Sequence, residues 1–280
     1  IRIDDLSELE KMVLVEKHLI SPALADESRN AGLILSYREN ISVMINEEDH
    51  LRIQCLSPGL QVRETWDWAI KIDDLFEENL DFAFDEKLGY LTSCPTNVGT
   101  GLRASVMMHL PALVLTGQIN RILSAVTQVG LAVRGLYGEG SEATGNLFQV
   151  SNQITLGQSE MEIIDNLYRV TRQIVDQEKE ARRRLLAESR LRLEDRVRRS
   201  YGILRYAEII DSKESAQRLS DLRLGASLGL VPEVKEQVLN ELLVSTQPGF
   251  LQYSHGGELS PEQRDAKRAE LIRGRLAQAG

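Results

Sequence analysis

The stretch CPTNVGTGLR, residues 94–103, places a cysteine, two glycines and an arginine within one turn-like segment. Gly99 and Gly101 permit a tight turn and let a ligand approach the backbone closely. Arg103 opens the segment that follows, which is a favourable position for a phosphate. A lone cysteine is more often a small buried hydrophobic residue. Cys94, however, leads into a glycine turn with an arginine nearby, and this favours a reactive thiolate.

A second polar segment, NEEDHLR at residues 46–52, lies between two strand patterns. Apolar and polar residues alternate over 41–45 and 51–55, which is the period of a β-strand. Three consecutive acids between strands are often no more than a polar turn. Arg52, however, follows Glu48 by four residues, so in an extended segment both side chains would project to one side. The pattern indicates either an acidic turn or a site that combines a carboxylate with an arginine.

The third segment is RGLYGEGSE, residues 134–142. A strand pattern over 131–133 ends at Arg134, and the glycine-rich loop that follows presents Glu139. Glycine-rich hairpins are frequent, so this motif is weak by itself. Taken together, the three segments put acids and arginines in loops and at strand ends, where binding and catalytic residues concentrate.

Hydrophobic periodicity divides the chain near residue 181. Strands and helices mix before that point, and only helical spacing follows it. The charged stretch at 178–199 has interspersed signs and recurring leucines, which favours a long half-solvated helix over a nucleic-acid-binding arm. The other expected elements are strands at 90–94 and 147–150 and helices at 63–80, 117–129, 213–223, 232–243 and 261–277.

Composition limits the functions open to the chain. Its 280 residues carry a formal net charge of −9, whereas general nucleic-acid binding needs a surplus of Lys and Arg. The longest apolar stretch, near 105–115, is too short to cross a bilayer. Two cysteines do not make a disulfide framework, which indicates a reducing cytoplasm. The sequence has no Walker A loop and no His/Cys cluster with metal-ligand spacing, so no protein metal site is expected.

The order and spacing of the three segments resemble those of phosphagen (guanidino) kinases. The segment VEKHLISP at 15–22 and the helical tail are most similar to the bacterial protein arginine kinases of that family. The resemblance implies an α+β fold. A catalytic domain over 1–181, with an antiparallel sheet flanked by helices, would precede an all-helical C-terminal domain over 182–280. The family's upstream SSRIR segment, with two phosphate-binding arginines, does not occur in these residues, so we expect a fragment.

The resemblance also implies roles for individual residues. Glu48 corresponds to the catalytic base that contacts the acceptor guanidinium, Glu139 to the carboxylate on its other side, and Cys94 to a cysteine beside the acceptor. ATP would be held mainly by arginines, with Mg²⁺ carried on its phosphates. The residues assigned to the nucleotide are His18, Arg52, Arg103, Ala104, Ser105, Val106, Met107, Arg134, Gly135, Leu136, Tyr137, Gly138 and Glu139.

An arginine acceptor would need such a set of residues. The guanidinium group is protonated and delocalised, which makes it a poor nucleophile. Two carboxylates can grip its planar fork and fix the direction of attack, and one of them can accept the proton. Arginines around the transferred phosphoryl group supply the positive charge that phosphoryl transfer requires.

The helical tail contains RDAKRA at 264–269, which resembles the phosphoarginine-binding RDxxRA motif of the bacterial kinases. By that resemblance Arg264, Asp265 and Arg268 belong to an allosteric phosphoarginine pocket. A reader of phosphoarginine needs a carboxylate for the guanidine and a cation for the phosphate, and adjacent Arg and Asp supply both. Without the resemblance, such a pair on a charged helix would be interpreted as solvated surface.

The expected function is ATP-dependent phosphorylation of arginine side chains in proteins. Two alternatives stay open: a kinase for free arginine or another small guanidine, and a catalytically silent phosphoarginine-binding or dimerising module. As partners, the resemblance implies protein substrates, a heat-shock repressor under regulation, a zinc-binding activator adaptor, and a Clp unfoldase–protease that degrades marked proteins. We further expect a cytoplasmic homodimer that contacts neither membrane nor nucleic acid directly.

Overall fold

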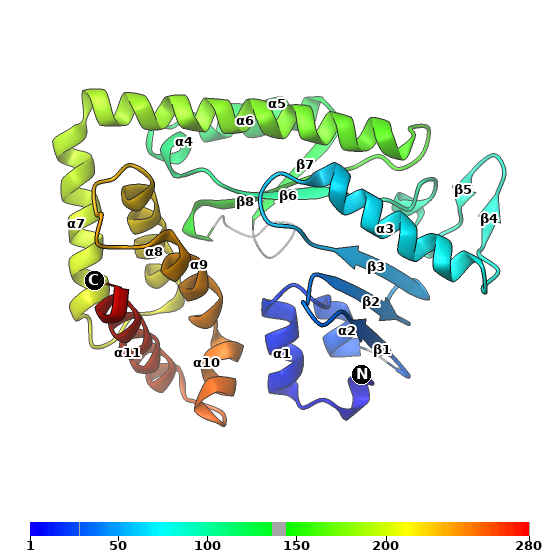
Figure 1. The fold of residues 1–280 in the computed structure, drawn as a ribbon, viewed down its shortest axis with the longest axis horizontal. Helices are drawn as coiled ribbons and strands as arrows, with labels where there is room; N and C mark the ends of the chain where they lie inside the picture. The colour runs from blue at the N-terminus through cyan, green and yellow to red at the C-terminus, as the bar shows by residue number, and fades with distance from the viewer. Residues whose placement is uncertain (28, 136–143, 280) are drawn as a thin grey trace. The chain divides into compact units, whose positions relative to one another are not determined.

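The computed structural model describes residues 1–27, 29–135 and 144–279 (Figure 1). Its helices and small antiparallel sheets confirm the predicted α+β class. In chain order the elements are η1 (Ile3–Asp5), α1 (Glu8–Glu16), α2 (Pro22–Glu27), β1 (Gly32–Leu35), β2 (Ile41–Ile45), β3 (Leu51–Cys55), α3 (Val62–Glu77), β4 (Phe84–Asp85), β5 (Gly89–Tyr90), η2 (Pro95–Asn97), β6 (Ser105–His109), α4 (Pro111–Leu115), α5 (Ile119–Gln128), β7 (Leu131–Gly135), η3 (Thr144–Asn146), β8 (Leu147–Asn152), α6 (Glu160–Glu188), α7 (Arg190–Tyr206), α8 (Ser212–Ser227), α9 (Glu236–Ser245), α10 (Pro248–His255) and α11 (Pro261–Ala279).

The chain forms two compact units, each assembled from segments that are far apart in the sequence. Within the described residues, every helix is too short or too polar to cross a lipid bilayer. The first unit comprises Ile1–Val106, Val126–Val133 and Val150–Arg172, and the second comprises Met107–Ala125, Arg134–Gln149 and Gln173–Gly280.

The antiparallel sheet β1-β2-β3 organises the first unit, and its strands confirm the patterns at 41–45 and 51–55. β2 is the central strand, with Val43 paired to Ile34 of β1 and to Ile53 of β3. Each large apolar side chain buried here contributes about 1.5–3 kcal/mol. The sheet thereby fixes the strand ends from which the 46–50 turn projects. Its packed core consists of Ile3, Ile20, Leu24, Ala25, Ala31, Leu33 and Met44.

The hairpin β4-β5 lies against the glycine turn that follows it. Tyr90 and Gly99 exchange backbone hydrogen bonds of 2.8 and 3.2 Å. Gly99 has a φ of 113°, and a Cβ atom there would lie 2.2 Å from the Thr155 carbonyl oxygen. Glycine is therefore required at this position for both its conformation and its lack of a side chain.

The strand predicted over 90–94 is wrong beyond its first residue. β5 ends at Tyr90, and the chain then bends, with Thr92 Oγ1 donating to the Cys94 carbonyl oxygen at 2.7 Å. Pro95 follows and opens η2; because proline has no N–H group, it cannot extend a strand ladder.

A further sheet, of order β6-β8-β7, contains the strands predicted at 131–133 and 147–150. β6 is a strand that the sequence pattern did not reveal. Its residues SVMMH alternate between exposed and less exposed positions, but the apolar run that continues into α4 hides this period of two.

Helices α7, α8, α9 and α11 surround the apolar core of the second unit, which includes Val197, Leu239 and Ile272. A Cβ atom on Gly225 of α8 would lie 2.3 Å from Val197 Cγ1, so the glycine permits close helix packing. The single helix predicted over 178–199 is wrong, because the backbone of Ser189 (φ −138°, ψ 28°) leaves the helical region and separates α6 from α7.

A buried carboxylate joins α6 to α4 within the second unit. Glu178 accepts hydrogen bonds from the amides of Ala112 and Leu113 at 3.1 and 3.0 Å, and from Arg182 Nε at 2.7 Å. The first amides of a helix have no partner inside the helix, so the carboxylate satisfies them. Arg182, one turn further along α6, balances the buried charge.

His109, the last residue of β6, is partly buried against α8. Its Nε2 lies 2.8 Å from Ser220 Oγ of α8, which also accepts a 2.7 Å hydrogen bond from Asn146 Nδ2. Burial, together with the positive charges of Arg223 and Arg182, lowers the pKa of His109 to about 3.

This lowered pKa predicts an acid-dependent loss of stability. At pH values between 6.5, the ordinary pKa of histidine, and about 3, the unfolded chain binds a proton at His109 and the folded chain does not. The free energy of unfolding therefore falls as the pH is lowered through this range. From pH 7 to pH 4 the wild type should lose roughly 3 kcal/mol more than His109→Gln. Urea unfolding across this range measures the difference.

The exposed His255 at the end of α10 provides the matched control for this experiment. His255→Gln should follow the wild type at every pH. Parallel curves for the wild type and His109→Gln would contradict the lowered pKa of His109.

Candidate active site

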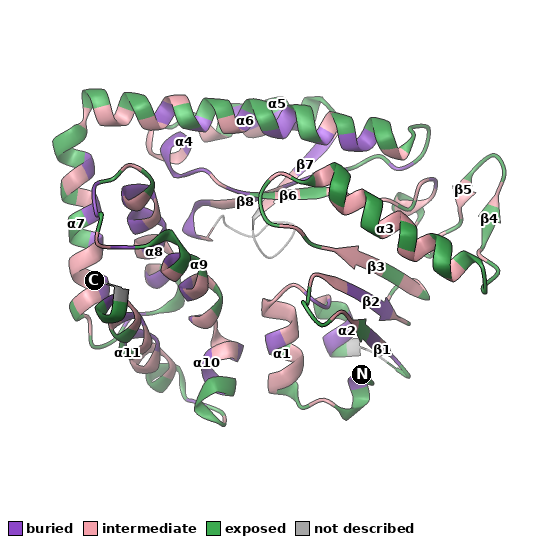
Figure 2. Ribbon diagram, viewed as in Figure 1, coloured by how far each residue is buried: buried purple, intermediate pink, exposed green. Residues whose placement is uncertain are grey.

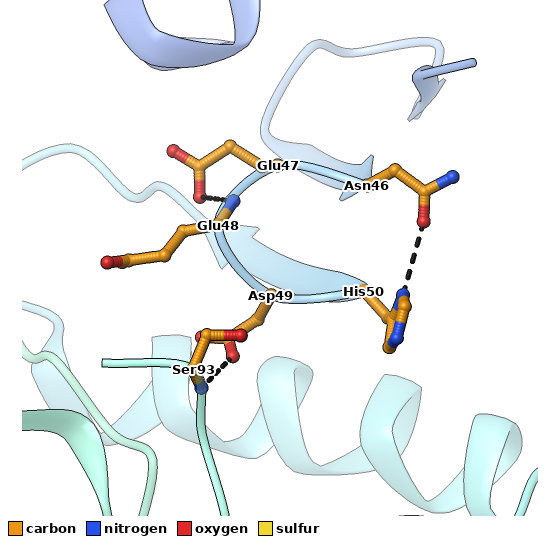
Figure 3. A pocket seen from close by; sticks show the side chains of 6 residues that line it. All are labelled: Asn46, Glu47, Glu48, Asp49, His50 and Ser93. Carbon is orange, nitrogen blue, oxygen red and sulfur yellow. Dashed lines mark hydrogen bonds between the residues drawn. The ribbon is translucent and has the colours of Figure 1, made fainter. Parts of the chain in front are cut away.

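The loop between β2 and β3 is a closed turn of five residues, 46–50. The Asn46 amide donates to the His50 carbonyl oxygen at 3.0 Å, and Asn46 Oδ1 lies 3.3 Å from His50 Nδ1 (Figure 3). Asn46 has a φ of 58°, a left-handed conformation that asparagine tolerates better than most residues. Its Nδ2 donates to the Asn30 carbonyl oxygen at 3.1 Å, which ties the turn to the chain before β1.

Glu47 is the buried anchor of this turn, with 6% of its side chain exposed. Its carboxylate accepts hydrogen bonds from Ser21 Oγ at 2.5 Å, from the Glu48 amide at 3.0 Å and from Arg52 Nη1 at 3.0 Å. Burial alone would raise the pKa of Glu47, but these hydrogen bonds and the charge of Arg52 outweigh burial and lower the pKa.

Of the two interpretations left open by the sequence, the structure has the acidic turn, and an arginine is paired with one of its acids. The period of an extended strand put Arg52 on the same side as Glu48, but Arg52 forms its ion pair with Glu47. The reason is the turn itself, which reverses the chain between the two positions. Arg52 keeps 47% of its side chain exposed, and the pair uses one of the several N–H donors of its guanidinium.

Glu48, by contrast, presents its carboxylate to solvent. It lines a pocket of about 360 Å³ together with Asn46, Glu47, Asp49, His50 and Ser93. Figure 3 shows no hydrogen bond on its carboxylate, and none comes from any residue that the structure describes. Among the residues that the structure describes, the lining has three acids and neither Lys nor Arg. Such a pocket suits a cationic group with several N–H donors, which a guanidinium is.

Asp49 joins the acidic turn to the segment that carries Cys94. Its Oδ1 accepts a 2.7 Å hydrogen bond from the Ser93 amide, as Figure 3 shows. Cys94 is half-buried, and its Sγ lies 3.0 Å from Thr96 Oγ1. The structure therefore brings the first two sequence segments, around Glu48 and Cys94, to one place in the first unit.

The VEKHLISP segment is attached to the same turn. His18 has a φ of 58°, and its carbonyl oxygen accepts a hydrogen bond from Gln54 Nε2, two residues beyond Arg52 on β3. Ser21, in the same segment, donates to Glu47. Burial lowers the pKa of the His18 imidazole, which favours its neutral form.

Arg103 is exposed and follows the glycine turn, as predicted. Asn152, a buried residue that sequence reasoning missed, holds this segment. Its side chain accepts from the Ala104 amide at 2.8 Å and donates to the carbonyl oxygens of Leu102 and Ile154 at 2.9 and 3.1 Å. A lone asparagine at the end of an apolar strand gave no signal of this role in the sequence.

The remaining nucleotide-assigned residues divide between the two units. Ser105 and Val106 lie in the part of β6 that belongs to the first unit, whereas Met107 and Arg134 belong to the second. Met107 is 44% exposed, Arg134 is half-buried in β7, and Gly135 ends that strand. The other predicted residues, Leu136, Tyr137, Gly138 and Glu139, lie outside the described residues.

The RDxxRA segment lies on α11, where its arginines have different environments. Arg264 is half-buried, and its Nη1 donates to the Leu259 carbonyl oxygen at 2.9 Å. Arg268 is almost fully buried, with 1% of its side chain exposed. Its guanidinium donates to the carbonyl oxygens of Thr246 and Ile210, both at 2.9 Å, and to Asp265 at 2.5 Å.

The Asp49–Ser93 hydrogen bond predicts local protection from hydrogen exchange. Asp49→Ala removes the acceptor, so the Ser93 amide should exchange on the order of tenfold faster while the rest of the sheet is unchanged. Hydrogen-exchange mass spectrometry on peptides that cover 91–98 measures this. Asp85→Ala is a matched control, because Asp85 Oδ1 accepts from the amides of Lys87 and Leu88. Asp85→Ala should speed exchange of the Lys87 and Leu88 amides and leave the exchange of Ser93 unchanged. Unaltered exchange of the Ser93 amide in Asp49→Ala would contradict the Asp49–Ser93 hydrogen bond.

Two family models cover most of the sequence. One, described as the ATP:guanido phosphotransferase C-terminal catalytic domain, matches residues 1–181. The other, described as the protein-arginine kinase McsB C-terminal domain, matches residues 190–280.

Curated relatives are similar along nearly the whole chain. A protein-arginine kinase of Brevibacillus brevis is 64% identical over 276 residues, which cover 99% of this chain and 77% of that protein. One from Halalkalibacterium halodurans is 64% identical over 274 residues, or 98% and 77% of the two chains. One from Bacillus subtilis is 60% identical over 276 residues, or 99% and 76%.

Solved structures of guanidino kinases share the fold. Lombricine kinase superimposes with a TM-score of 0.54 at 25% identity, covering 63% of this chain and 52% of that one. The substrate-free duplicated taurocyamine kinase of Schistosoma mansoni does so with a TM-score of 0.53 at 20% identity, covering 91% and 40%. Fold, family models and curated relatives agree, and the chain therefore belongs to the ATP:guanido phosphotransferase family, in the group of protein-arginine kinases.

Proposed function

We propose that this protein transfers the γ-phosphoryl group of ATP to the guanidino group of arginine side chains in proteins. The observation that carries the proposal is the acidic turn: the Glu47 carboxylate holds the turn, and the exposed Glu48 carboxylate lines a pocket whose described residues include no Lys or Arg. Membership of the protein-arginine kinases, at 60–64% identity to curated relatives, supports this acceptor over a small free guanidine.

Glu48 would act on the acceptor guanidinium in two ways. Its carboxylate accepts hydrogen bonds from the planar N–H groups and so fixes the nitrogen that attacks phosphorus. It also takes the proton that this nitrogen loses as the N–P bond forms and the bond to the ADP leaving oxygen breaks. Glu139 would hold the opposite edge of the guanidinium, a role that rests on the resemblance alone.

Arginines would stabilise the negative charge of the ATP phosphates. We assign this role to Arg52, Arg103 and Arg134, since guanidinium groups match phosphate oxygens in geometry and charge. Mg²⁺ would enter bound to the nucleotide, because its preferred ligands include phosphate oxygens and water. Within the described residues, no group of three or more His, Cys, Asp or Glu side chains is placed to hold a metal ion. We therefore assign no catalytic step to a metal bound by the protein.

In the tail, we propose that Arg264 and Asp265 bind phosphoarginine. Asp265 has 34% of its side chain exposed, and Arg264 lies beside it on α11. Arg268 is buried and donates hydrogen bonds to two backbone carbonyl oxygens and to Asp265. It would thereby fix the position of the Asp265 carboxylate. The proposed partners are a heat-shock repressor, a zinc-binding activator adaptor and a Clp unfoldase–protease that would take the phosphorylated proteins as clients.

The direct test of the activity uses radiolabelled ATP with a protein acceptor and with free arginine in parallel. We expect label on the protein, and Glu48→Gln should reduce the rate on the order of 10²-fold or more, because the pocket loses the carboxylate that holds the guanidinium and accepts its proton. Glu39→Gln is the control: Glu39 is exposed and forms an ion pair with Lys17 across 2.9 Å. Near-normal turnover by Glu48→Gln, or label on free arginine alone, would overturn the proposal.

The tail gives a separate prediction. Arg264→Ala should remove the response of kinase activity to added phosphoarginine peptide without lowering the thermal unfolding midpoint. Arg268→Ala should lower that midpoint by several degrees, because it leaves buried carbonyl groups and a carboxylate without their donor. Lys267→Ala, at an exposed ion pair of the same helix, should change neither property. Equal responses to the peptide in wild type and Arg264→Ala would leave this segment as ordinary helix surface.

A further inference from the structure

Nearly all of the net negative charge of the chain is concentrated in one segment. Residues 64–86, here called the acidic segment, contain nine Asp or Glu residues and one Lys, a net charge of −8 against −9 for all 280 residues. The acidic segment comprises most of α3 and leads into the β4-β5 hairpin. Figure 2 shows α3 without a buried residue, in green and pink along its length.

Large apolar side chains are exposed among these acids. Trp68 and Leu75 of α3 are 38% and 61% exposed, and Leu80 and Phe84 are 46% and 58% exposed. Exposed apolar side chains among charges of one sign suit a partner of opposite charge that also has apolar groups to bury.

A groove of about 290 Å³ lies beside the acidic segment, and we call it the aromatic groove. Its lining includes Phe84, Leu88 and Leu156, which are 58%, 47% and 49% exposed, and Tyr90. Among the described residues the lining has one base, Lys87, and one acid, Glu160, so the groove is close to neutral. The negative charge comes from α3, to which the groove is joined: the Tyr90 hydroxyl donates to Asp73 Oδ2 at 2.9 Å.

Contacts within the chain hold the walls of the aromatic groove. Phe84 packs edge-on against Tyr90, with ring centroids 5.3 Å apart. On the other wall, the Thr100 amide donates to the Thr155 carbonyl oxygen at 2.9 Å, while Thr155 Oγ1 donates to the carbonyl oxygens of Thr96 and Val98. A site with fixed walls loses little conformational entropy when it binds an extended chain.

We propose that the aromatic groove and the acidic segment together bind the polypeptide that flanks the acceptor arginine, selecting segments that carry basic residues and an apolar side chain. The inference rests on the proposed function. Tyr90 in the groove and Ser93 in the pocket of Glu48 are three residues apart, at most about 10 Å of extended chain. A bound segment of a few residues can therefore reach from one site to the other.

The pocket around Glu48 would bind the acceptor guanidinium, and the surface formed by the aromatic groove and the acidic segment would bind the residues that flank it. The described residues that line the pocket around Glu48 are polar or charged; they suit a guanidinium and offer no large apolar side chain to the residues that flank it. Basic residues beside that arginine would meet the acids of α3, which would speed encounter and depend on ionic strength. The apolar side chain would be buried against Phe84 and Leu88, where it would slow dissociation.

The test begins with binding to the full chain in the absence of ATP. The probe is a fluorescein-labelled peptide of twelve residues with one Arg flanked by Lys and Leu. The comparison peptide replaces the flanks by Gly and Ser. Fluorescence anisotropy should show tighter binding of the first peptide, and 0.5 M NaCl should remove most of the difference.

Charge reversal locates the surface. The variant Asp74→Lys/Glu77→Lys/Glu78→Lys changes three exposed acids of α3 and its C-cap, and should weaken binding of the Lys/Leu peptide about tenfold or more. Phe84→Ser should weaken it severalfold. The matched control, Asp176→Lys/Glu188→Lys/Asp195→Lys, makes the same change in net charge at exposed positions of α6 and α7 and should bind within about twofold of the wild type.

Kinetics with ATP separate docking from catalysis. In the α3 variant the KM for the Lys/Leu peptide should rise and kcat should be retained, while turnover of the Gly/Ser peptide is unchanged. Equal weakening of peptide binding by the two triple variants would overturn the proposal. So would an α3 triple variant that binds the peptide like the wild type but has an altered sedimentation coefficient, because the surface would then join copies of the chain. If the wild type phosphorylates neither peptide, the proposed function fails, and the anisotropy experiment still decides whether the surface binds basic polypeptides.

Discussion

The buried carboxylate of Glu47 is the constraint on which the candidate site depends. Taking a carboxylate out of water is costly unless its oxygens are satisfied. Here Ser21, the Glu48 amide and Arg52 satisfy them. The three donors come from the chain before α2, from the turn itself and from β3, so one side chain fixes three segments. Glu48 is left with an exposed carboxylate because its neighbour has taken the structural role.

The same separation of structural and chemical roles recurs elsewhere in the molecule. Glu178 caps α4 and is balanced by Arg182, so that carboxylate is committed to the fold. Arg268 is committed in the same way to the carbonyl groups of Ile210 and Thr246, whereas Arg264 beside it keeps a half-exposed position.

Sequence reasoning predicted the local structure well wherever a period was uninterrupted, as in β2, β3, α5 and α11. It could not predict which member of a charged run turns inward, because Glu47, Glu48 and Asp49 are chemically alike and only the closure of the turn by Asn46 and His50 distinguishes them. It also missed β6, whose alternation is hidden in an apolar run, and the supporting roles of Asn152 and Asp49, which depend on contacts between distant segments.

The central claim is that the acceptor atom is a guanidinium nitrogen of a protein. Phosphorus-31 NMR of an acceptor protein, recorded after incubation with this chain and ATP and after removal of nucleotide, tests it most directly. The account predicts a phosphoramidate signal that disappears on mild acid treatment, because a P–N bond is cleaved once its nitrogen is protonated, and that is absent when Glu48→Gln is used. An acid-stable phosphate-ester signal on the acceptor, or a signal of the same size with Glu48→Gln, would contradict it.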